Sequence, residues 1–157
     1  MVIIVIFSLI KISPAQTDPN RQDILGKTPL MRASKDDNPA AVEDLLKNGA
    51  DIHATDRKGK TALMYAAQDS KSGVVINILL KNGADANVQD LKGRTALMYA
   101  TDHPPNVAAL LKGGADINIQ DQRGITVLMS SQTGSSEKVV NNLLKNGADI
   151  NIKDVDN

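Results

Sequence analysis

The chain has 157 residues, and its 18 basic and 18 acidic side chains give a formal net charge of zero at pH 7. This balance excludes the strong positive field with which proteins attract a phosphate backbone, and one Phe and two Tyr offer few platforms for stacking bases. The absence of cysteine excludes disulfides, thiolate metal ligands and cysteine nucleophiles. Because the charge is balanced and aromatic residues are few, we expect no nucleic-acid partner.

Residues 2–10 form an apolar run that differs from the rest of the chain. The run is shorter than the ~20 residues of a membrane-spanning helix and has the length of a signal-peptide core. Ser13 and Ala15 follow as small residues at a cleavage site. We expect a signal peptide at 1–15, a linker at 16–22, and a periplasmic or secreted protein that meets the membrane only during export. Because no Lys or Arg precedes the run, a buried strand or short anchor of a cytoplasmic protein is the alternative.

Two landmarks recur in step along the remainder of the chain. A glycine followed two residues later by threonine begins each unit at Gly26, Gly59, Gly93 and Gly124. A Gly-Ala-Asp motif closes each unit, at 49–51, 83–85, 114–116 and 147–149. Self-similarity with a period near 33 residues predicts a solenoid of stacked units, which binds other molecules along its surface.

The second unit, 56–89, shows how one period folds. Asp56 and Gly59 favour a turn, and Thr61 is placed to cap a short helix over 62–67. Apolar residues at helical spacing predict a second helix over 74–81, which Gly83 ends in a left-handed conformation. An extended arm over 84–88 then leads to the next turn.

This plan resembles the ankyrin repeat. Thr28-Pro29-Leu30-Met31 is similar to the family's Thr-Pro-Leu-His signature, with methionine in place of histidine. The resemblance implies an all-α repeat solenoid of four helix-turn-helix units joined by β-hairpin-like arms over 23–153, with a tail at 154–157. The units are 23–55, 56–89, 90–120 and 121–153. The methionines that replace the histidine are expected in the core as flexible apolar fillers; they are Met31, Met64, Met98 and Met129.

Differences between units give them individual character. In the third unit, Pro104 and Pro105 are expected to stiffen the loop and to delay the second helix until after Pro105. In the fourth, the polar run 130–132 stands where the second unit has Tyr-Ala-Ala, which predicts a terminal repeat with a polar outer face. The tail starts another turn and is either a frayed end or the remnant of a longer product.

Residues that often carry chemistry have structural interpretations here. His53 stands where other units have Asn, and His103 lies beside Pro104; neither has a second His or Cys at metal-ligand spacing. Asp56, Asp90 and Asp121 recur in register as turn formers. We therefore expect a non-enzyme with no cofactor and no metal.

The resemblance implies a protein-binding surface on a concave face of hairpin tips and first helices. We expect Tyr65 and Tyr99 at its centre, because tyrosine offers contact area with a polar tip, or else packed between the layers. Substitution of both tyrosines by alanine would distinguish these hypotheses: lost partner binding at an unchanged melting temperature favours the binding surface, and a large drop in melting temperature favours packing. The other expected contacts are Arg32, Arg57, Lys58, Gln68, Asp69, Leu91, Lys92, Asp102, Gln122, Arg123 and Ser130. A monomer that binds a protein partner is the expected function, and self-association through the end faces of the stack is the alternative.

Overall fold

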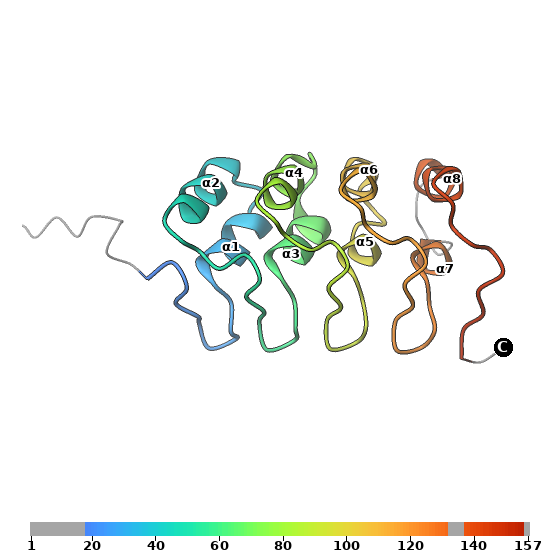
Figure 1. Ribbon diagram of the computed structural model, residues 1–157, viewed down its shortest axis with the longest axis horizontal. Helices are drawn as coiled ribbons and strands as arrows, with labels where there is room; N and C mark the ends of the chain where they lie inside the picture. Colours follow the sequence, from blue (N-terminus) through green and yellow to red (C-terminus); the bar gives the residue numbers. More distant parts are fainter. Residues whose placement is uncertain (1–17, 132–136, 156–157) are drawn as a thin grey trace, which may run out of the picture.

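The computed structural model describes residues 18–131 and 137–155, and within these ranges it contains eight α-helices and no strand. The helices stand in two rows, with a hairpin projecting below each pair (Figure 1). The first row contains α1 (Pro29–Lys35), α3 (Ala62–Asp69), α5 (Ala96–Tyr99) and α7 (Val127–Ser131). The second row contains α2 (Pro39–Lys47), α4 (Val74–Lys81), α6 (Pro104–Lys112) and α8 (Glu137–Lys145). The predicted signal peptide at 1–15 lies outside the described residues.

Helix ends follow the capping residues identified in the sequence. The Thr61 hydroxyl accepts a hydrogen bond from the Met64 N–H at 3.3 Å, and Thr28 caps α1 in the same way. Gly83 follows α4 with a φ of +91°, a conformation that favours glycine. The predicted helix over 74–81 is confirmed as α4, and the helix predicted over 62–67 continues to Asp69 as α3.

The expected delay of the helix in the third unit is wrong. Helix α6 begins at Pro104, with both prolines in its first turn and His103 as the N-cap residue. Proline is well accommodated there because the first N–H groups of a helix have no partner within the helix. The prolines therefore start α6 instead of lengthening the loop before it.

The core lies between the two rows of helices and is aliphatic. Met31 and Met64 are each 1% exposed, and Met98 is half-buried against the core, as expected. Met129 is also half-buried, but it borders an open hollow with Ile125 and Ile150 beyond α7, where no further helix covers it within the described ranges.

Of the expected polar face at 130–132, the structure describes Ser130 and Ser131, and Ser130 is half-buried. Ser131 is buried, and the Ser130 and Ser131 hydroxyls donate to carbonyls of their own helix at 2.9 and 2.7 Å; Gln132 lies outside the described residues. The next turn stacks on this unit, since the Val155 N–H donates to the Arg123 carbonyl. The hairpin of the fourth unit is therefore bonded to the next turn, whereas α7 has no further helix against it within the described ranges.

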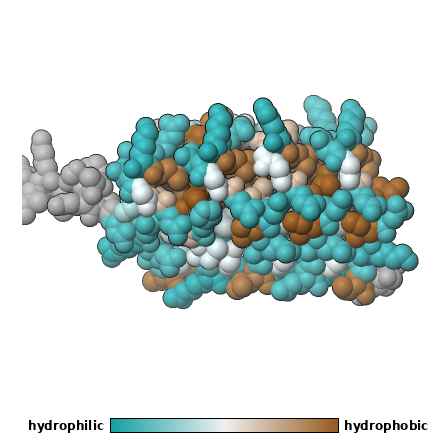
Figure 2. All heavy atoms as spheres, viewed as in Figure 1, coloured by the Kyte–Doolittle hydropathy of each residue, from teal (hydrophilic) through white to brown (hydrophobic). Residues whose placement is uncertain are grey.

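The surface is predominantly hydrophilic on the side shown in Figure 2, where hydrophobic patches are small and separated. No helix in the described part of the chain is long and apolar enough to span a membrane.

Candidate functional site

One aspartate organises each hairpin turn. Asp56 Oδ1 accepts hydrogen bonds from the N–H groups of Lys58 and Lys60 at 2.8 and 2.9 Å. Asp90 and Asp121 make the same pair of bonds to residues two and four positions further on. The prediction that these aspartates form turns is confirmed, and Asp23 does the same in the first unit.

Neighbouring turns are bonded into a continuous stack. The Leu91 N–H donates to the Lys58 carbonyl at 3.0 Å, and the Gln122 N–H donates to the Lys92 carbonyl at 3.0 Å. Gly93 permits this approach: its φ is +77°, and a Cβ there would lie 2.8 Å from the Gln122 nitrogen. The hairpin tips are therefore held in fixed register.

The two tyrosines bond to the turn aspartates of their own units. The Tyr65 hydroxyl donates to Asp56 Oδ2 at 2.7 Å, and the Tyr99 hydroxyl donates to Asp90 Oδ2 at 2.6 Å. Burial first, and then the aspartate that each hydroxyl meets, raises the pKa of both phenols far above the ordinary value. Tyr99 is half-buried, whereas Tyr65 is only 7% exposed, so Tyr65 agrees with the alternative in which the ring is packed between the layers.

Cationic side chains cover these tyrosine rings. The Lys27 and Lys60 amines lie 4.6 and 4.8 Å from the centre of the Tyr65 ring. The Lys60 amine also lies 3.9 Å from the centre of the Tyr99 ring, and the Arg94 guanidinium carbon lies 4.5 Å from it. At these distances the cations are attracted to the aromatic faces. Rings and cations thus alternate across three units.

Lys60 is the buried member of this series. It is 8% exposed, and its amine donates to Gln68 Oε1 at 2.5 Å. Burial, and then the charge of Arg94, lowers the pKa of Lys60. Lys27, Lys60 and Arg94 are not among the residues predicted from the sequence, although the residue after the repeated glycine is basic in three of the four units.

The remaining predicted residues fall into two groups. The tip residues are all exposed: Arg57, Lys58, Leu91, Lys92, Gln122 and Arg123. On the first-helix side, Arg32 is exposed and pairs with Asp23 at 2.8 Å, Asp69 is half-buried, and Asp102 is exposed between α5 and α6. Ser130 is half-buried, and its hydroxyl donates to the Val127 carbonyl.

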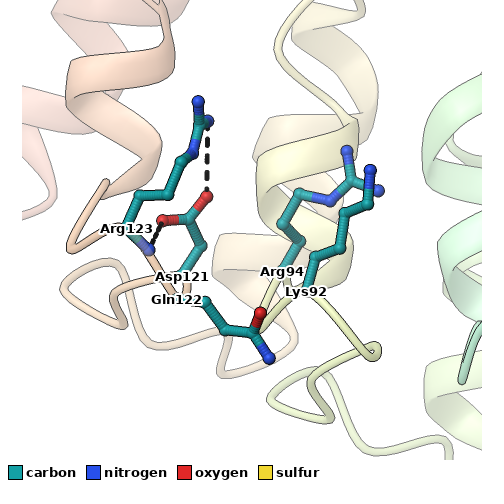
Figure 3. A pocket seen from close by; sticks show the side chains of 5 residues that line it. All are labelled: Lys92, Arg94, Asp121, Gln122 and Arg123. Atoms are coloured by element: carbon teal, nitrogen blue, oxygen red, sulfur yellow. Dashed lines mark hydrogen bonds and ion pairs between the residues drawn. The ribbon is translucent and has the colours of Figure 1, made fainter.

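We call the hairpins together with the first-row helices the hairpin face. Among the hollows along it, two adjacent ones share Arg94. The first, of about 440 Å³, contains most of the basic residues and is lined by Lys27, Lys35, Lys58, Lys60, Tyr65, Gln68, Asp69, Arg94 and Tyr99. The second, of about 400 Å³, is lined by Lys92, Arg94, Asp121, Gln122 and Arg123 (Figure 3). In Figure 3 its basic side chains extend from two neighbouring hairpins, and Arg123 approaches Asp121 at 3.6 Å.

The histidines make structural contacts. The backbone N–H of His53 donates to Asp51 Oδ1, and His103 Nε2 lies 3.1 Å from the Gln68 carbonyl oxygen of the preceding unit. In the described ranges, no group of three or more His, Cys, Asp or Glu side chains is placed to hold a metal ion.

Comparison with known proteins places these features in a family. The family model for ankyrin repeats, in three copies, matches residues 5–90 and residues 69–154. The chain is also 46% identical over 50 residues to the NF-kappa-B inhibitor delta of Mus musculus. That match covers 32% of this chain and 15% of the relative, so it spans only a small part of the relative's length.

Proposed function

The chain belongs to the ankyrin repeat family, whose members are generally non-enzymatic protein-interaction modules, and on this premise we propose that it binds a partner protein through its hairpin face. The supporting observation is the row of exposed tip side chains on a stack of bonded turns. A surface held in fixed register loses little conformational freedom on binding, so more of its contact energy appears as affinity. Leu91, 67% exposed between basic tips, supplies an apolar contact in this row.

The residue chemistry supports binding over catalysis. The aspartates that recur along the face are occupied: each accepts two backbone N–H groups, and two of them also accept a tyrosine hydroxyl. A carboxylate held in this way is a poor general base, because its acceptor positions are already used. The name of the relative, NF-kappa-B inhibitor delta, describes a protein that acts on another protein, which also supports a protein partner for this chain.

Site-specific crosslinking tests the proposal. A photoreactive amino acid replaces Leu91 at a hairpin tip in one variant and Asn77, exposed on α4, in a matched control. Both are irradiated in extracts of the source organism, and the crosslinked peptides are sequenced. We expect one partner protein to be captured from position 91 and not from position 77. Equal capture from both positions, or capture from 77 alone, contradicts the proposed face.

We also propose that the protein is exported and monomeric. The apolar run at 2–10 with Ser13 and Ala15 supports cleavage after Ala15. The intact mass of the expressed full chain, taken from periplasmic and cytoplasmic fractions, tests this. A periplasmic product that begins at Gln16 is the expected result, and a cytoplasmic product that retains Met1 contradicts it.

Self-association through an end face is the second candidate function. Ile150, 73% exposed, borders a hollow of about 640 Å³ with Ile125 and Met129 beyond α7. Burial of apolar surface drives association. Sedimentation of the full chain decides: a dimer that Ile150→Asp converts to a monomer favours this candidate, and a wild-type monomer rejects it.

A further inference from the structure

Lys60 is a buried residue, and among the described residues its amine has no acidic partner at ion-pair distance. Among the described residues, ion pairs are formed by Arg32, Arg94 and Arg123, and none by Lys60. Its contacts are one neutral amide oxygen and two aromatic faces. Buried charges in proteins are normally paired, since removing an ion from water is costly. The amine is therefore positioned for an anion that this chain does not itself supply.

The nearest carboxylates are already committed to structure. Asp56 and Asp90 each use one oxygen for two backbone N–H groups and the other for a tyrosine hydroxyl. Asp69 is the single acidic residue that lines the hollow around Lys60. Four other basic side chains line the same hollow: Lys27, Lys35, Lys58 and Arg94. The Arg94 Nε is buried, and no hydrogen-bond acceptor lies within reach of it in the described part of the chain. The hydrogen-bond donors that line this hollow thus outnumber the acceptors that remain available to them.

We propose that this hollow receives a glutamate or aspartate side chain from an acidic segment of the partner protein. The inference rests on the proposed function, because it names the chemistry of the partner bound at the hairpin face. Charge complementarity carries it: five basic side chains and one acidic side chain line a concave site of about 440 Å³, and within the described residues only Arg94 among the five pairs with a turn aspartate, Asp90. Arg94 also lines the adjacent hollow, one repeat further, where Lys92 and Arg123 extend from the hairpins (Figure 3). The segment therefore carries a second acidic residue for that hollow.

A pair of synthetic peptides tests the charge requirement directly. The first is a fluorescent eight-residue peptide of alternating glutamate and glycine, and the second replaces every glutamate with glutamine. Binding to the full chain is measured by fluorescence anisotropy at low and at physiological salt. We expect the glutamate peptide to bind at least tenfold more tightly than the glutamine peptide, with a difference that decreases as salt rises. Equal binding of the two peptides overturns the proposal.

Substitutions locate the site. Lys60→Met removes the charge and retains an unbranched apolar chain, while Lys81→Met removes an exposed lysine from the end of α4 as the matched control. We expect about a tenfold or greater loss of glutamate-peptide affinity for Lys60→Met and an unchanged affinity for Lys81→Met. Equal losses in both variants would mean that binding follows overall charge and would contradict a specific pocket. Thermal unfolding checks that each variant is folded, and Lys60→Gln replaces Lys60→Met if the latter fails to fold.

The two proposals fail in different ways. If the partner crosslinked through position 91 binds the Lys60→Met variant with wild-type affinity, the acidic-segment inference is wrong and the hairpin face still stands. If no partner is captured from position 91, the proposed function itself fails. Tighter binding of a polyphosphate chain than of the glutamate peptide, with the same loss in Lys60→Met, would assign the pocket to phosphate and overturn a carboxylate ligand.

Discussion

At the scale of single residues, aspartate and asparagine side chains form hydrogen bonds that stabilise the repeats. Asp90 accepts hydrogen bonds from the Lys92 and Arg94 N–H groups and from the Tyr99 hydroxyl, and it pairs with the Arg94 guanidinium at 3.2 Å. Burial by itself raises the pKa of Asp90, but the bond from Tyr99 and the bonds from the two N–H groups outweigh it and lower the pKa below its ordinary value. The ionised carboxylate therefore stabilises the fold.

The lowered pKa of Asp90 predicts that the free energy of unfolding depends on pH. Because the folded-state pKa of Asp90 is lowered, its contribution is complete above the unfolded value of about 4 and is lost as pH falls through the folded value. We expect Asp90→Asn to reduce the free energy of unfolding by about 2 kcal/mol at pH 7 and by less at pH 3. Urea unfolding at both pH values measures this, with the exposed Asp44→Asn as control. A difference that stays constant with pH would refute the assignment.

Asn106 is a second residue whose role the sequence did not reveal. It is buried, and its side-chain amide donates to the Ser70 and Ala67 carbonyls of the preceding unit at 2.7 and 3.1 Å. The second and fourth units have Val75 and Val139 at this position. The amide thus satisfies carbonyls at the end of α3 that have no donor within their own helix.

Replacement of Asn106 by the valine of its sister units should therefore destabilise the protein. Asn106→Val leaves two carbonyls without their donors, and we expect a loss of about 2 kcal/mol in the free energy of unfolding. Denaturant unfolding measures it, and Asn77→Val, on the exposed surface of α4, is the control. A neutral or stabilising Asn106→Val would show that the valine packs well enough to replace the amide.

At the scale of elements, the arms are joined by side-chain bridges at three of their four junctions. Asn20 and Asn87 each donate to a carbonyl and accept an N–H of the next arm, and Asn118 accepts the Asp149 N–H. Gln22, Gln89 and Gln120 add bonds to the carbonyl of the next arm. The junction between 50–55 and 84–89 lacks both bridges within the described residues. His53 stands where the other arms have the bridging asparagine, and Thr55 stands where they have the bridging glutamine.

Restoring these residues should strengthen that junction. We expect the double substitution His53→Asn with Thr55→Gln to raise the free energy of unfolding by about 1–2 kcal/mol, since it adds bonds between neighbouring units. The reverse change at the next junction, Asn87→His with Gln89→Thr, should lower the stability by a similar amount. Chemical denaturation of both variants gives the comparison, and a lack of change in both would show that the arms contribute little to cohesion.

Local signals made part of this fold predictable from sequence. The bounds of α4 and the turns at Asp56 and Asp90 depend on neighbouring residues, and they agree with the predictions. The prediction of where α6 begins was wrong. Two prolines can either break a helix or begin one, and packing decides between these two outcomes. The sequence of its own unit could not decide whether Tyr65 is exposed or packed, because Lys27, which covers its ring, comes from the unit before.

At the scale of the whole molecule, a chain with no net charge carries an uneven distribution of charge. Basic side chains gather on the hairpin face, while the carboxylates beneath them are used in the turns. The stacked turns and capped helices fix the positions of these groups across several units (Figure 1). A zero net charge limits long-range steering, so affinity at this face depends on close contacts.

The affinity of the crosslinked partner for two matched triple variants tests the central claim most directly. The first variant changes the hairpin tips, with Lys58→Ser, Lys92→Ser and Arg123→Ser. The second changes equivalent exposed positions at the ends of second-row helices, with Lys47→Ser, Lys81→Ser and Lys112→Ser. By calorimetric titration, we expect the tip variant to bind at least tenfold more weakly, about 1.4 kcal/mol, and the second variant to bind as the wild type does. Wild-type affinity in the tip variant, with loss in the other, would contradict a partner site on the hairpin face.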